Sequence, residues 1–321
     1  NSEINVGTSS TLSMSGVISG LTKSLTKTGM GTLTLSAANT YSGGTTINVG
    51  TVRVSVSSTG GPSPTAITNG GLGTGDVSVA SGATLDIYNG TYTISNNVSV
   101  SGLGTGATVG ALTNSYPDGY GYSGTFSGAI SLVGATAIGG NTALSITGII
   151  SDGGNAYSLS KVGTGTVTLT NAGNSYGGGT TITAGILSIN NDANLGAVPG
   201  SVSAASITLN GGALQASTSA TVTLNTNRGI TLTAASGLAA STSATLNYAG
   251  IIAGANAGHG LTINGASQTG TVVLSGTNTY TGTTTIRAGI LSISSDANLG
   301  AVPGSVSAAS ITLNGGALQA S

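Results

Sequence analysis

Short segments in which polar and apolar residues alternate recur along the whole chain. Thr32–Leu35 reads Thr-Leu-Thr-Leu, Thr166–Leu169 reads Thr-Val-Thr-Leu, and Ile230–Leu232 reads Ile-Thr-Leu. Alternation with a period of two residues predicts short β-strands that are buried on one face. Gly-Gly, Asn-Gly and Ser-Gly pairs follow many of these segments and are typical of turns. The pattern predicts an all-β protein, with the Ala234–Ala240 segment, in which a serine and a glycine interrupt the alanines, as a loop.

One block of sequence occurs twice. Ala184–Ser217 returns at Ala288–Ser321, 104 residues later, and the two copies differ at only two positions. A looser pattern, in which a tyrosine is followed by a glycine, two adjacent threonines and an isoleucine, surrounds Tyr41, Tyr176 and Tyr280. Internal repetition of this kind is typical of proteins that are built by adding like units.

Each predicted strand is too short to be stable alone. Burial of two or three inward side chains does not offset the loss of backbone conformational entropy, which costs about 1–2 kcal/mol per ordered residue. A β-sandwich or barrel and a coil whose turns stack on one another both solve this problem. The coil fits better, since the inward positions are mostly Ile, Leu and Val, and glycine permits tight corners. We therefore predict a parallel β-helix, with about 20–25 residues per turn and about 13 to 16 turns. It is expected to be one continuous solenoid over residues 1–321, with repeat units near 12–142, 143–245 and 246–321.

The composition narrows the possible partners. Only six Lys or Arg and seven Asp or Glu occur, about 4% of the chain, where roughly 25% is usual for soluble domains. Disorder is excluded because 38% of the residues are hydrophobic and charge is scarce. A net charge of −1 predicts no binding of nucleic acid or of an anionic membrane. No run of 18 apolar residues is present, so no transmembrane segment is expected.

Cysteine is absent, and the first residue is Asn. Absence of cysteine is compatible with a reducing compartment, and equally with a bacterial surface protein that crosses a membrane unfolded. We expect the chain to be a window of a longer protein.

Three stretches share the pattern Gly-x-Gly-Thr-x-x-Leu followed by Asn-Thr-Tyr-x-Gly-x-Thr-Thr-Ile. They are Gly29–Val52 and, with small departures, Gly163–Leu187 and Gly270–Leu291. Ser175 replaces a threonine, and Ala266–Gln268 stand where the other copies have Lys-x-Gly. The pattern resembles the autotransporter-associated β-strand repeat. This resemblance implies a right-handed parallel β-helix, secreted to the surface of a Gram-negative bacterium as a passenger or as part of a very large surface protein. It implies no catalytic residue.

Tyr116, Tyr120 and Tyr122 form the densest aromatic cluster of the sequence. Clustered tyrosines on a loop are typical of surfaces that bind sugars or protein partners. The alternative is a loop insertion that simply packs against the solenoid.

Glycoside hydrolysis usually needs two carboxylates roughly 5–9 Å apart. Of the acids in the sequence, Asp76 and Asp86 are the two that could form such a pair most readily. Each of them borders a turn or a strand end, however, and a structural role there explains the residue more simply. Asp192 and Asp296 are equivalent positions of the duplicated block, about five turns apart, and cannot pair. His259 has no carboxylate nearby in the sequence and is expected to be an exposed loop residue. We predict no catalytic residue, no metal site and no cofactor, and hence no enzyme.

The expected function is that of an extracellular structural repeat protein, which forms a rod, stalk or self-associating fibre or sheath on a bacterial surface. Low charge gives weak protection against association, and uncapped end turns expose strand edges, so self-association is the expected partner interaction. The alternative is an adhesin module that recognises glycans or host surfaces through the Tyr116–Tyr122 loop. A polysaccharide-active enzyme is a third possibility.

Overall fold

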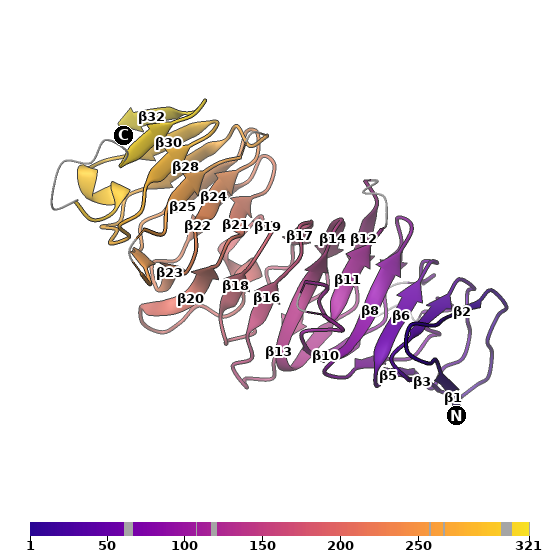
Figure 1. Ribbon diagram of the computed structural model, residues 1–321. Helices are drawn as coiled ribbons and strands as arrows, with labels where there is room; N and C mark the ends of the chain where they lie inside the picture. Colours follow the sequence, from indigo (N-terminus) through magenta and orange to yellow (C-terminus); the bar gives the residue numbers. More distant parts are fainter. Residues whose placement is uncertain are drawn as a thin grey trace. The chain divides into compact units, whose positions relative to one another are not determined.

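The computed structural model describes residues 1–60, 67–106, 108–116, 121–256, 258–265, 267–302 and 310–320. Over these residues the chain forms short parallel strands that stack coil on coil as a β-solenoid, with about 12 turns in all. Figure 1 shows the stacked strands within each part of the chain. The predicted all-β parallel β-helix is confirmed, with slightly fewer turns than expected. The chain divides into two compact units, Asn1–Tyr176 (unit 1) and Gly177–Ser321 (unit 2). The predicted repeat boundaries stay a prediction.

Unit 1 is built from three ladders, which are rows of parallel strands in which each strand pairs with a strand one coil further along. The first ladder contains β1 (Ser2–Asn5), β3 (Leu25–Thr28), β5 (Thr45–Ile47), β7 (Val77–Val79), β10 (Val98–Gly102), β13 (Ile130–Gly140) and β15 (Ile150–Ser151). The second contains β2 (Thr11–Met14), β4 (Thr32–Leu35), β6 (Gly50–Val54), β8 (Ala83–Tyr88), β11 (Leu112–Ser115), the second half of β13, and β16 (Leu159–Lys161). The third contains β9 (Thr93–Ile94), β12 (Ser123–Phe126), β14 (Ala143–Ile146) and β17 (Thr166–Leu169).

Unit 2 repeats this design. Its first ladder contains β18 (Thr180–Ile182), β20 (Ser203–Leu209), β23 (Arg228–Leu232) and β26 (Ile252–Gly254). The second contains β19 (Ile186–Ile189), β21 (Ala213–Ala216), β24 (Ser236–Ala240), β27 (Leu261–Ile263), β29 (Thr284–Ile286) and β31 (Ile311–Leu313). The third contains β22 (Thr221–Leu224), β25 (Thr245–Tyr248), β28 (Thr271–Leu274), β30 (Ile290–Ile293) and β32 (Ala317–Ala320). Two short 3-10 helices, η1 (Asp192–Leu195) and η2 (Asp296–Leu299), follow β19 and β30.

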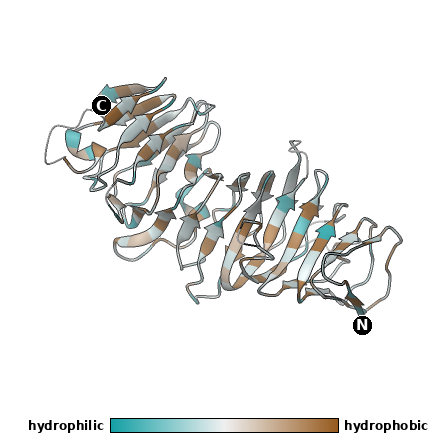
Figure 2. Ribbon diagram, in the orientation of Figure 1, coloured by the Kyte–Doolittle hydropathy of each residue, from teal (hydrophilic) through white to brown (hydrophobic). Residues whose placement is uncertain are grey.

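The interior of each unit is a stack of aliphatic side chains. In the second ladder of unit 1, Leu33, Val52, Leu85 and Leu112 lie in register on successive coils, and all are completely buried. Figure 2 shows apolar and polar positions alternating along such strands. Full burial of one aliphatic side chain is worth about 1.5–3 kcal/mol. Each coil therefore gains its stability by lying on the previous one.

The Ala234–Ala240 segment is not a loop, and this expectation was wrong. Ser236–Ala240 forms β24, which pairs with β21 on one side and β27 on the other. Alanine, serine and glycine have little preference for strands, so the neighbouring strands impose the conformation. A Cβ added at Gly237 would lie 3.0 Å from the Cβ of Ala213, which favours a residue without a side chain.

The asparagine of the repeat pattern joins three coils. Asn278 is buried, and its Oδ1 accepts a hydrogen bond from the backbone N–H of Ile252 in the preceding coil (2.8 Å). Its Nδ2 donates to the carbonyl of Asn298 in the following coil (2.6 Å). Asn39 makes the same two bonds, to Ile18 and Gly71, in the first repeat. The side chain thus satisfies one donor and one acceptor at a corner where the ladders are interrupted.

The tyrosine and the first threonine of the pattern are also internal. Tyr41 and Tyr280 are buried, and their hydroxyls lie 2.6 Å and 2.7 Å from the Oγ1 atoms of Thr45 and Thr284. Thr45 donates to the carbonyl of Leu72 (2.9 Å), so Tyr41 is the donor to Thr45. Burial raises the pKa of Tyr41 and of Tyr280 to about 12, with the threonine hydrogen bonds opposing the shift.

The lysine of the pattern is buried inside the coil. Lys27 is completely buried, and its Nζ donates to the carbonyls of Thr28, Gly29 and Val49. Lys161 in the second repeat donates to Val162 and Gly163. Burial lowers the pKa of Lys27, and lowers that of Lys161 to about 8.

The third repeat lacks this lysine, and an asparagine replaces its function. The Nδ2 of Asn264 donates to the carbonyls of Gly270 (2.9 Å) and Ala288 (3.1 Å). Ala288 precedes the Gly289 corner as Val49 precedes the Gly50 corner in the first repeat. The departure from the sequence pattern therefore leaves the donor at the corner in place.

Successive repeats are rotated by one ladder. In unit 1, β3 of the first repeat lies in the first ladder, whereas the equivalent β16 of the second repeat lies in the second ladder. In unit 2, β18 lies in the first ladder, whereas the equivalent β29 lies in the second. The repeat is therefore not a whole number of coils, and the same motif faces a different side in consecutive repeats.

We predict that Asn278→Ala destabilises the protein. The substitution leaves the N–H of Ile252 and the carbonyl of Asn298 buried without their partner, at a cost of about 2–5 kcal/mol for the two groups together. The measurement is urea unfolding followed by circular dichroism. Asn247→Ala on the exposed side of β25 is the control and should change the unfolding free energy by less than about 0.5 kcal/mol. Equal effects of the two substitutions would contradict the bridging role.

Candidate binding site on unit 1

The outer face of the second ladder in unit 1 brings together charged and aromatic residues that are distant in sequence. Arg53 on β6, Asp86 on β8 and Thr113 on β11 are neighbours in register. Tyr88 and Ser115 form the next such pair along β8 and β11. These five residues alternate with the inward-facing aliphatic positions of their strands, so their side chains point away from the coil interior. Arg53, Tyr88 and Ser115 are half-buried, whereas Asp86 and Thr113 are buried.

Arg53 is held by two interactions. Its Nε donates to Oδ2 of Asp86 at 3.1 Å, and its guanidinium carbon lies 4.1 Å from the centre of the Tyr88 ring. Attraction between a cation and an aromatic face is worth about 0.5–1 kcal/mol at an exposed site. The Arg53 side chain is 32% exposed, whereas that of Asp86 is only 3% exposed. Solvent thus reaches the cation of the ion pair but hardly the carboxylate.

This arrangement changes the pKa of the Asp86 carboxyl group. Burial raises its pKa to about 6, although the hydrogen bond from Ser115 Oγ (2.6 Å) and the charge of Arg53 both act to lower it. Its other oxygen, Oδ1, is buried and has no hydrogen-bond partner among the described residues, and the same holds for Oγ1 of Thr113. A buried carboxylate with one satisfied oxygen is destabilised in its charged form.

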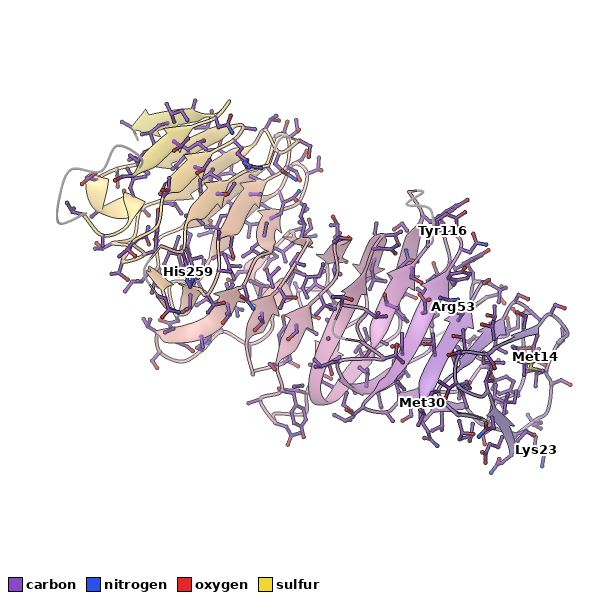
Figure 3. The ribbon with its side chains drawn as sticks, viewed as in Figure 1. Met14, Lys23, Met30, Arg53, Tyr116 and His259 are labelled. Atoms are coloured by element: carbon purple, nitrogen blue, oxygen red, sulfur yellow. The ribbon has the colours of Figure 1, made fainter. Side chains whose placement is uncertain are left out.

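Two of the three predicted loop tyrosines lie beside this cluster. Tyr116 directly follows Ser115, and its ring packs edge-to-face on Tyr122, with 5.0 Å between the ring centres and 70° between the planes. Both rings are half-buried. Asn141 holds the Tyr116 backbone, accepting from its N–H (3.1 Å) and donating to its carbonyl (2.7 Å). Figure 3 shows Tyr116 and Arg53 in the same part of unit 1. Tyr120 lies outside the described residues, and the binding role of the loop stays a prediction.

The remaining candidate acids have separate partners. Asp76 is exposed and accepts a hydrogen bond from Asn97 Nδ2 (3.2 Å), whereas Asp86 is bonded to Arg53 and Ser115. Asp192 in unit 2 forms an ion pair with Arg228. In the described ranges, no group of three or more His, Cys, Asp or Glu residues lies close enough to hold a metal ion.

His259 lies in a loop, as expected, but its side chain is half-buried rather than exposed. Its Nδ1 lies 3.0 Å from the carbonyl of Leu232, to which it can only donate a hydrogen bond (Figure 3). The ring packs on the preceding coil, an interaction that a single glycine-rich segment of sequence does not reveal.

Sequence reasoning missed Arg53, Tyr88, Thr113 and Ser115. The register brings Arg53 beside Asp86 across 33 residues, because the intervening loop lengthens that coil. The only local signal is the placement of charged and polar residues at outward positions of short strands.

No helix among the described residues is long and apolar enough to cross a membrane.

Comparisons with known proteins agree with the repeat pattern. Residues 25–54, 159–189 and 266–293 match the Passenger-associated-transport-repeat family. The chain is also similar to the adhesin BmaC autotransporter of Brucella suis biovar 1 (strain 1330), with 35% identity over 270 residues. This alignment covers 82% of the chain and 7% of the relative, so the chain spans a small part of that protein's length. No solved structure matches the chain.

We predict that Asp86→Asn stabilises the protein at neutral pH. Because the folded-state pKa of about 6 exceeds the ordinary value of 3.8, the folded protein binds the proton more tightly than the unfolded chain. The stability that Asp86 contributes is complete below pH 3.8 and is lost as the pH rises through about 6. The neutral amide should therefore raise the unfolding free energy at pH 7 by about 1–3 kcal/mol and give no advantage at pH 4. Thermal unfolding at both pH values is the measurement.

Asp76→Asn is the control, since it removes the same charge from an exposed position of unit 1. A loss of stability in Asp86→Asn at pH 7 would show that the ion pair with Arg53 outweighs the cost of burial.

Proposed function

Because the chain is an autotransporter passenger repeat protein, we propose that it is a structural repeat segment of an adhesin exposed on the surface of a Gram-negative bacterium. Passenger repeats and an adhesin relative both support an extracellular location. We further propose that the solenoid serves as a stalk or rod, or self-associates into a fibre or sheath. Only 13 charged residues in 321 give its surface little electrostatic protection against association.

The observation that supports this proposal best is that the recurrent residues of the repeat pattern lie in the interior of the solenoid. The asparagine, tyrosine, first threonine and lysine of the pattern are all buried, and in the first repeat each bonds within the coil or to a neighbouring coil. Residues that recur for catalysis or binding would reach the surface. Recurrence of buried connecting residues is instead what a scaffold requires.

The interactions of three aspartates among the described residues also support a non-enzymatic function. Asp86, Asp152 and Asp192 each accept hydrogen bonds that fix a strand pair or a turn. Asp152, for example, accepts from the N–H groups of Gly154 and Tyr157, as is usual for an aspartate that stabilises a turn.

A deletion of one repeat tests the scaffold proposal. Removing Ala184–Arg287 joins Thr183 to Ala288, and thereby restores the duplicated sequence in register. Since each coil depends mainly on its neighbours, we expect the shortened protein to fold and to reach the cell surface within its full-length parent. Circular dichroism and protease accessibility on intact cells are the measurements.

Removing Ala184–Ser275 is the matched control, because it joins Thr183 to Gly276 in the middle of a coil. This variant should lose cooperative unfolding and surface exposure. If neither deletion is tolerated, the repeats are not interchangeable structural units.

A second function is favoured by the cluster on unit 1. Arg53 offers an accessible cation above the Tyr88 ring, and Tyr116 and Tyr122 lie at the end of the adjacent strand. Aromatic faces beside a few hydrogen-bonding groups are typical of sugar-binding surfaces. We propose that this cluster, with the loop that contains Tyr120, binds glycans or host surfaces.

A glycan array tests this second function. Replacing both Tyr116 and Tyr122 by Ala should lower a glycan signal at least about tenfold, because the two rings supply most of the apolar contact area. Tyr157→Ala, which changes a half-buried tyrosine elsewhere in unit 1, is the control and should leave the signal unchanged. Absence of any glycan signal for the unaltered chain would count against the proposal.

A further inference from the structure

The chain offers few cations to a negatively charged ligand. It contains six lysines and arginines, and all of them lie among the described residues. Half of them are buried, with at most 1% of their surface exposed: Lys27, Lys161 and Arg228. The others reach the solvent: Lys23, Arg53 and Arg287. A ligand that is recognised through a salt bridge to a cationic side chain therefore has three candidate partners.

Arg53 is the exposed cation that other side chains hold in place. Its Nε donates to Oδ2 of Asp86 (3.1 Å), and the Ser115 hydroxyl donates to the same oxygen (2.6 Å). The guanidinium carbon lies 4.1 Å from the centre of the Tyr88 ring. The side chains of the other two exposed cations form no hydrogen bond or ion pair with a described residue. A guanidinium that is already oriented loses less conformational freedom when a ligand binds.

Most donors of this guanidinium have no partner. Arginine carries five N–H groups, and in Arg53 only the one on Nε is bonded to a described residue. The two terminal nitrogens therefore keep four N–H groups without a partner in the described part of the chain. Asp86 contacts Arg53 through one oxygen, and its side chain is only 3% exposed, so a ligand meets the guanidinium rather than this carboxylate. Two parallel N–H groups of a guanidinium match the two oxygens of a carboxylate.

Aromatic rings belong to the same cluster. Tyr88 pairs in register with Ser115, and Tyr116 directly follows Ser115. The Tyr116 ring packs edge-to-face on Tyr122, 5.0 Å away between ring centres. Figure 3 shows Tyr116 and Arg53 in the same part of unit 1. Aromatic faces beside a few hydrogen-bonding groups suit the apolar face of a sugar ring.

Arg287 lacks this combination. It lines a cavity of about 310 Å³ in unit 2, whose other described lining residues are mostly small, such as Gly212, Ala213 and Gly237. No aromatic side chain is among the described residues that line this cavity. An exposed arginine is thus present there without a fixed orientation and without a surface on which a sugar ring could stack.

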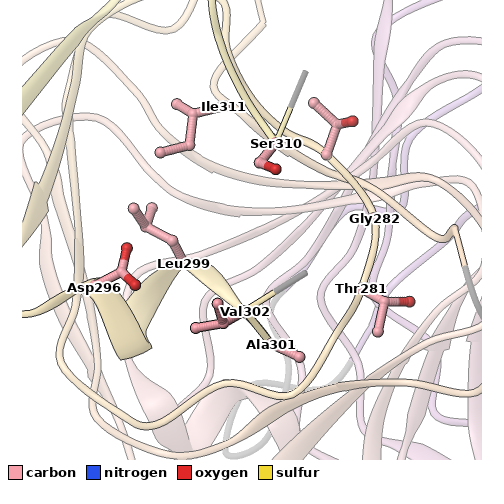
Figure 4. A pocket seen from close by; sticks show the side chains of 10 residues that line it. Thr281, Gly282, Asp296, Leu299, Ala301, Val302, Ser310 and Ile311 are labelled. Carbon is pink, nitrogen blue, oxygen red and sulfur yellow. The ribbon is translucent and has the colours of Figure 1, made fainter. Parts of the chain in front are cut away.

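The cavity beside η2 has the opposite charge. It measures about 180 Å³, and its described lining residues include Asp296 but no lysine or arginine. Figure 4 shows the Asp296 carboxylate at the η2 side of this cavity. A negatively charged ligand would be repelled there. Among the described residues, only the cluster on unit 1 combines an oriented, accessible cation with aromatic rings.

We propose that Arg53 binds the carboxylate of an acidic sugar, a uronic or a sialic acid, whose ring lies against the tyrosines of the cluster. The terminal nitrogens of Arg53 donate to the two carboxylate oxygens, and Tyr88 and Asp86 keep the guanidinium in the orientation that this contact requires. Arginine suits the site better than lysine, because its planar group donates in fixed directions. The inference rests on the second function proposed above and adds to it the class of glycan.

Nuclear magnetic resonance of the arginine side chains tests this contact directly. The chain has only three arginines, so its Nε–H groups give three signals, and Arg53→Gln identifies that of Arg53. The probes are the methyl glycosides of glucuronic acid and of N-acetylneuraminic acid, each beside its neutral carboxamide. The Arg53 signal should shift saturably with one or both acids, and the responding acid identifies the source of the carboxylate. The carboxamide of that sugar should bind at least about tenfold more weakly.

The other two arginines are internal controls. The signal of buried Arg228 should not move, and that of exposed Arg287 should move far less than that of Arg53. Equal shifts of Arg53 and Arg287 would mean unspecific ion pairing and would overturn the proposal. Equal affinity of acid and carboxamide would also overturn it, but would leave glycan binding by the cluster intact. Tighter binding of N-acetylglutamate amide than of either sugar acid would show that a peptide carboxylate is preferred, and would overturn the assignment to sugars.

Substitutions separate the carboxylate contact from glycan binding as a whole. Arg53→Gln should lower the affinity for the sugar acid at least about tenfold and leave the weak affinity for its carboxamide unchanged. Arg53→Lys, which keeps the charge but not the planar group, should also bind the acid more weakly. Arg287→Gln removes an exposed arginine from unit 2 and is the matched control, with unchanged affinity expected. Unchanged affinity of Arg53→Gln for the acid would contradict the proposal, whereas loss of all glycan signals in the array would contradict the second function itself.

Discussion

The fold depends on satisfying the backbone groups at its corners. Within the ladders, every coil bonds to its neighbours, but between ladders the chain turns and its carbonyls lose their strand partners. Lys27, Asn278 and Arg228 meet this need from inside the coil, each donating to carbonyls of its own or an adjacent coil. Buried polar groups without partners cost about 1–3 kcal/mol each, so a solenoid with this many corners requires such side chains. Most of the recurrent polar residues of the repeat pattern are side chains that bond to these corner groups.

The strands could be predicted from sequence because alternation reports directly which side chains face inward. The burial of residues such as Leu33 and Val52 can be predicted from the alternation of polar and apolar residues around them. Ser236–Ala240 could not be predicted, since its strand conformation comes from the strands on either side. The repeat pattern marks Lys27 as recurrent, but nothing in the sequence shows that a lysine is buried, because that depends on carbonyls at Thr28, Gly29 and Val49.

The candidate site was only partly predictable for the same reason. Tyr116 and Tyr122 are close in sequence, and their contact follows from one short loop. Arg53 and Asp86 meet only because their strands occupy successive coils of different length. Register between coils is set by loop lengths that local sequence patterns do not encode. Outer-surface chemistry of a solenoid is thus harder to predict than its core.

Several of the few charged side chains of the chain are buried, and this lowers the charge of the surface. Lys27, Asp86, Asp152, Lys161 and Arg228 are all buried, which leaves fewer than 13 charges for the outside. Since successive repeats turn by one ladder, equivalent outward positions of consecutive repeats lie on different sides of the coil rather than in one stripe. A chain of this kind can be lengthened by whole repeats without accumulating net charge or a single continuous apolar face. Burying these charges therefore leaves the outer surface of the described coils nearly neutral, so that like repeats can follow one another without a build-up of surface charge.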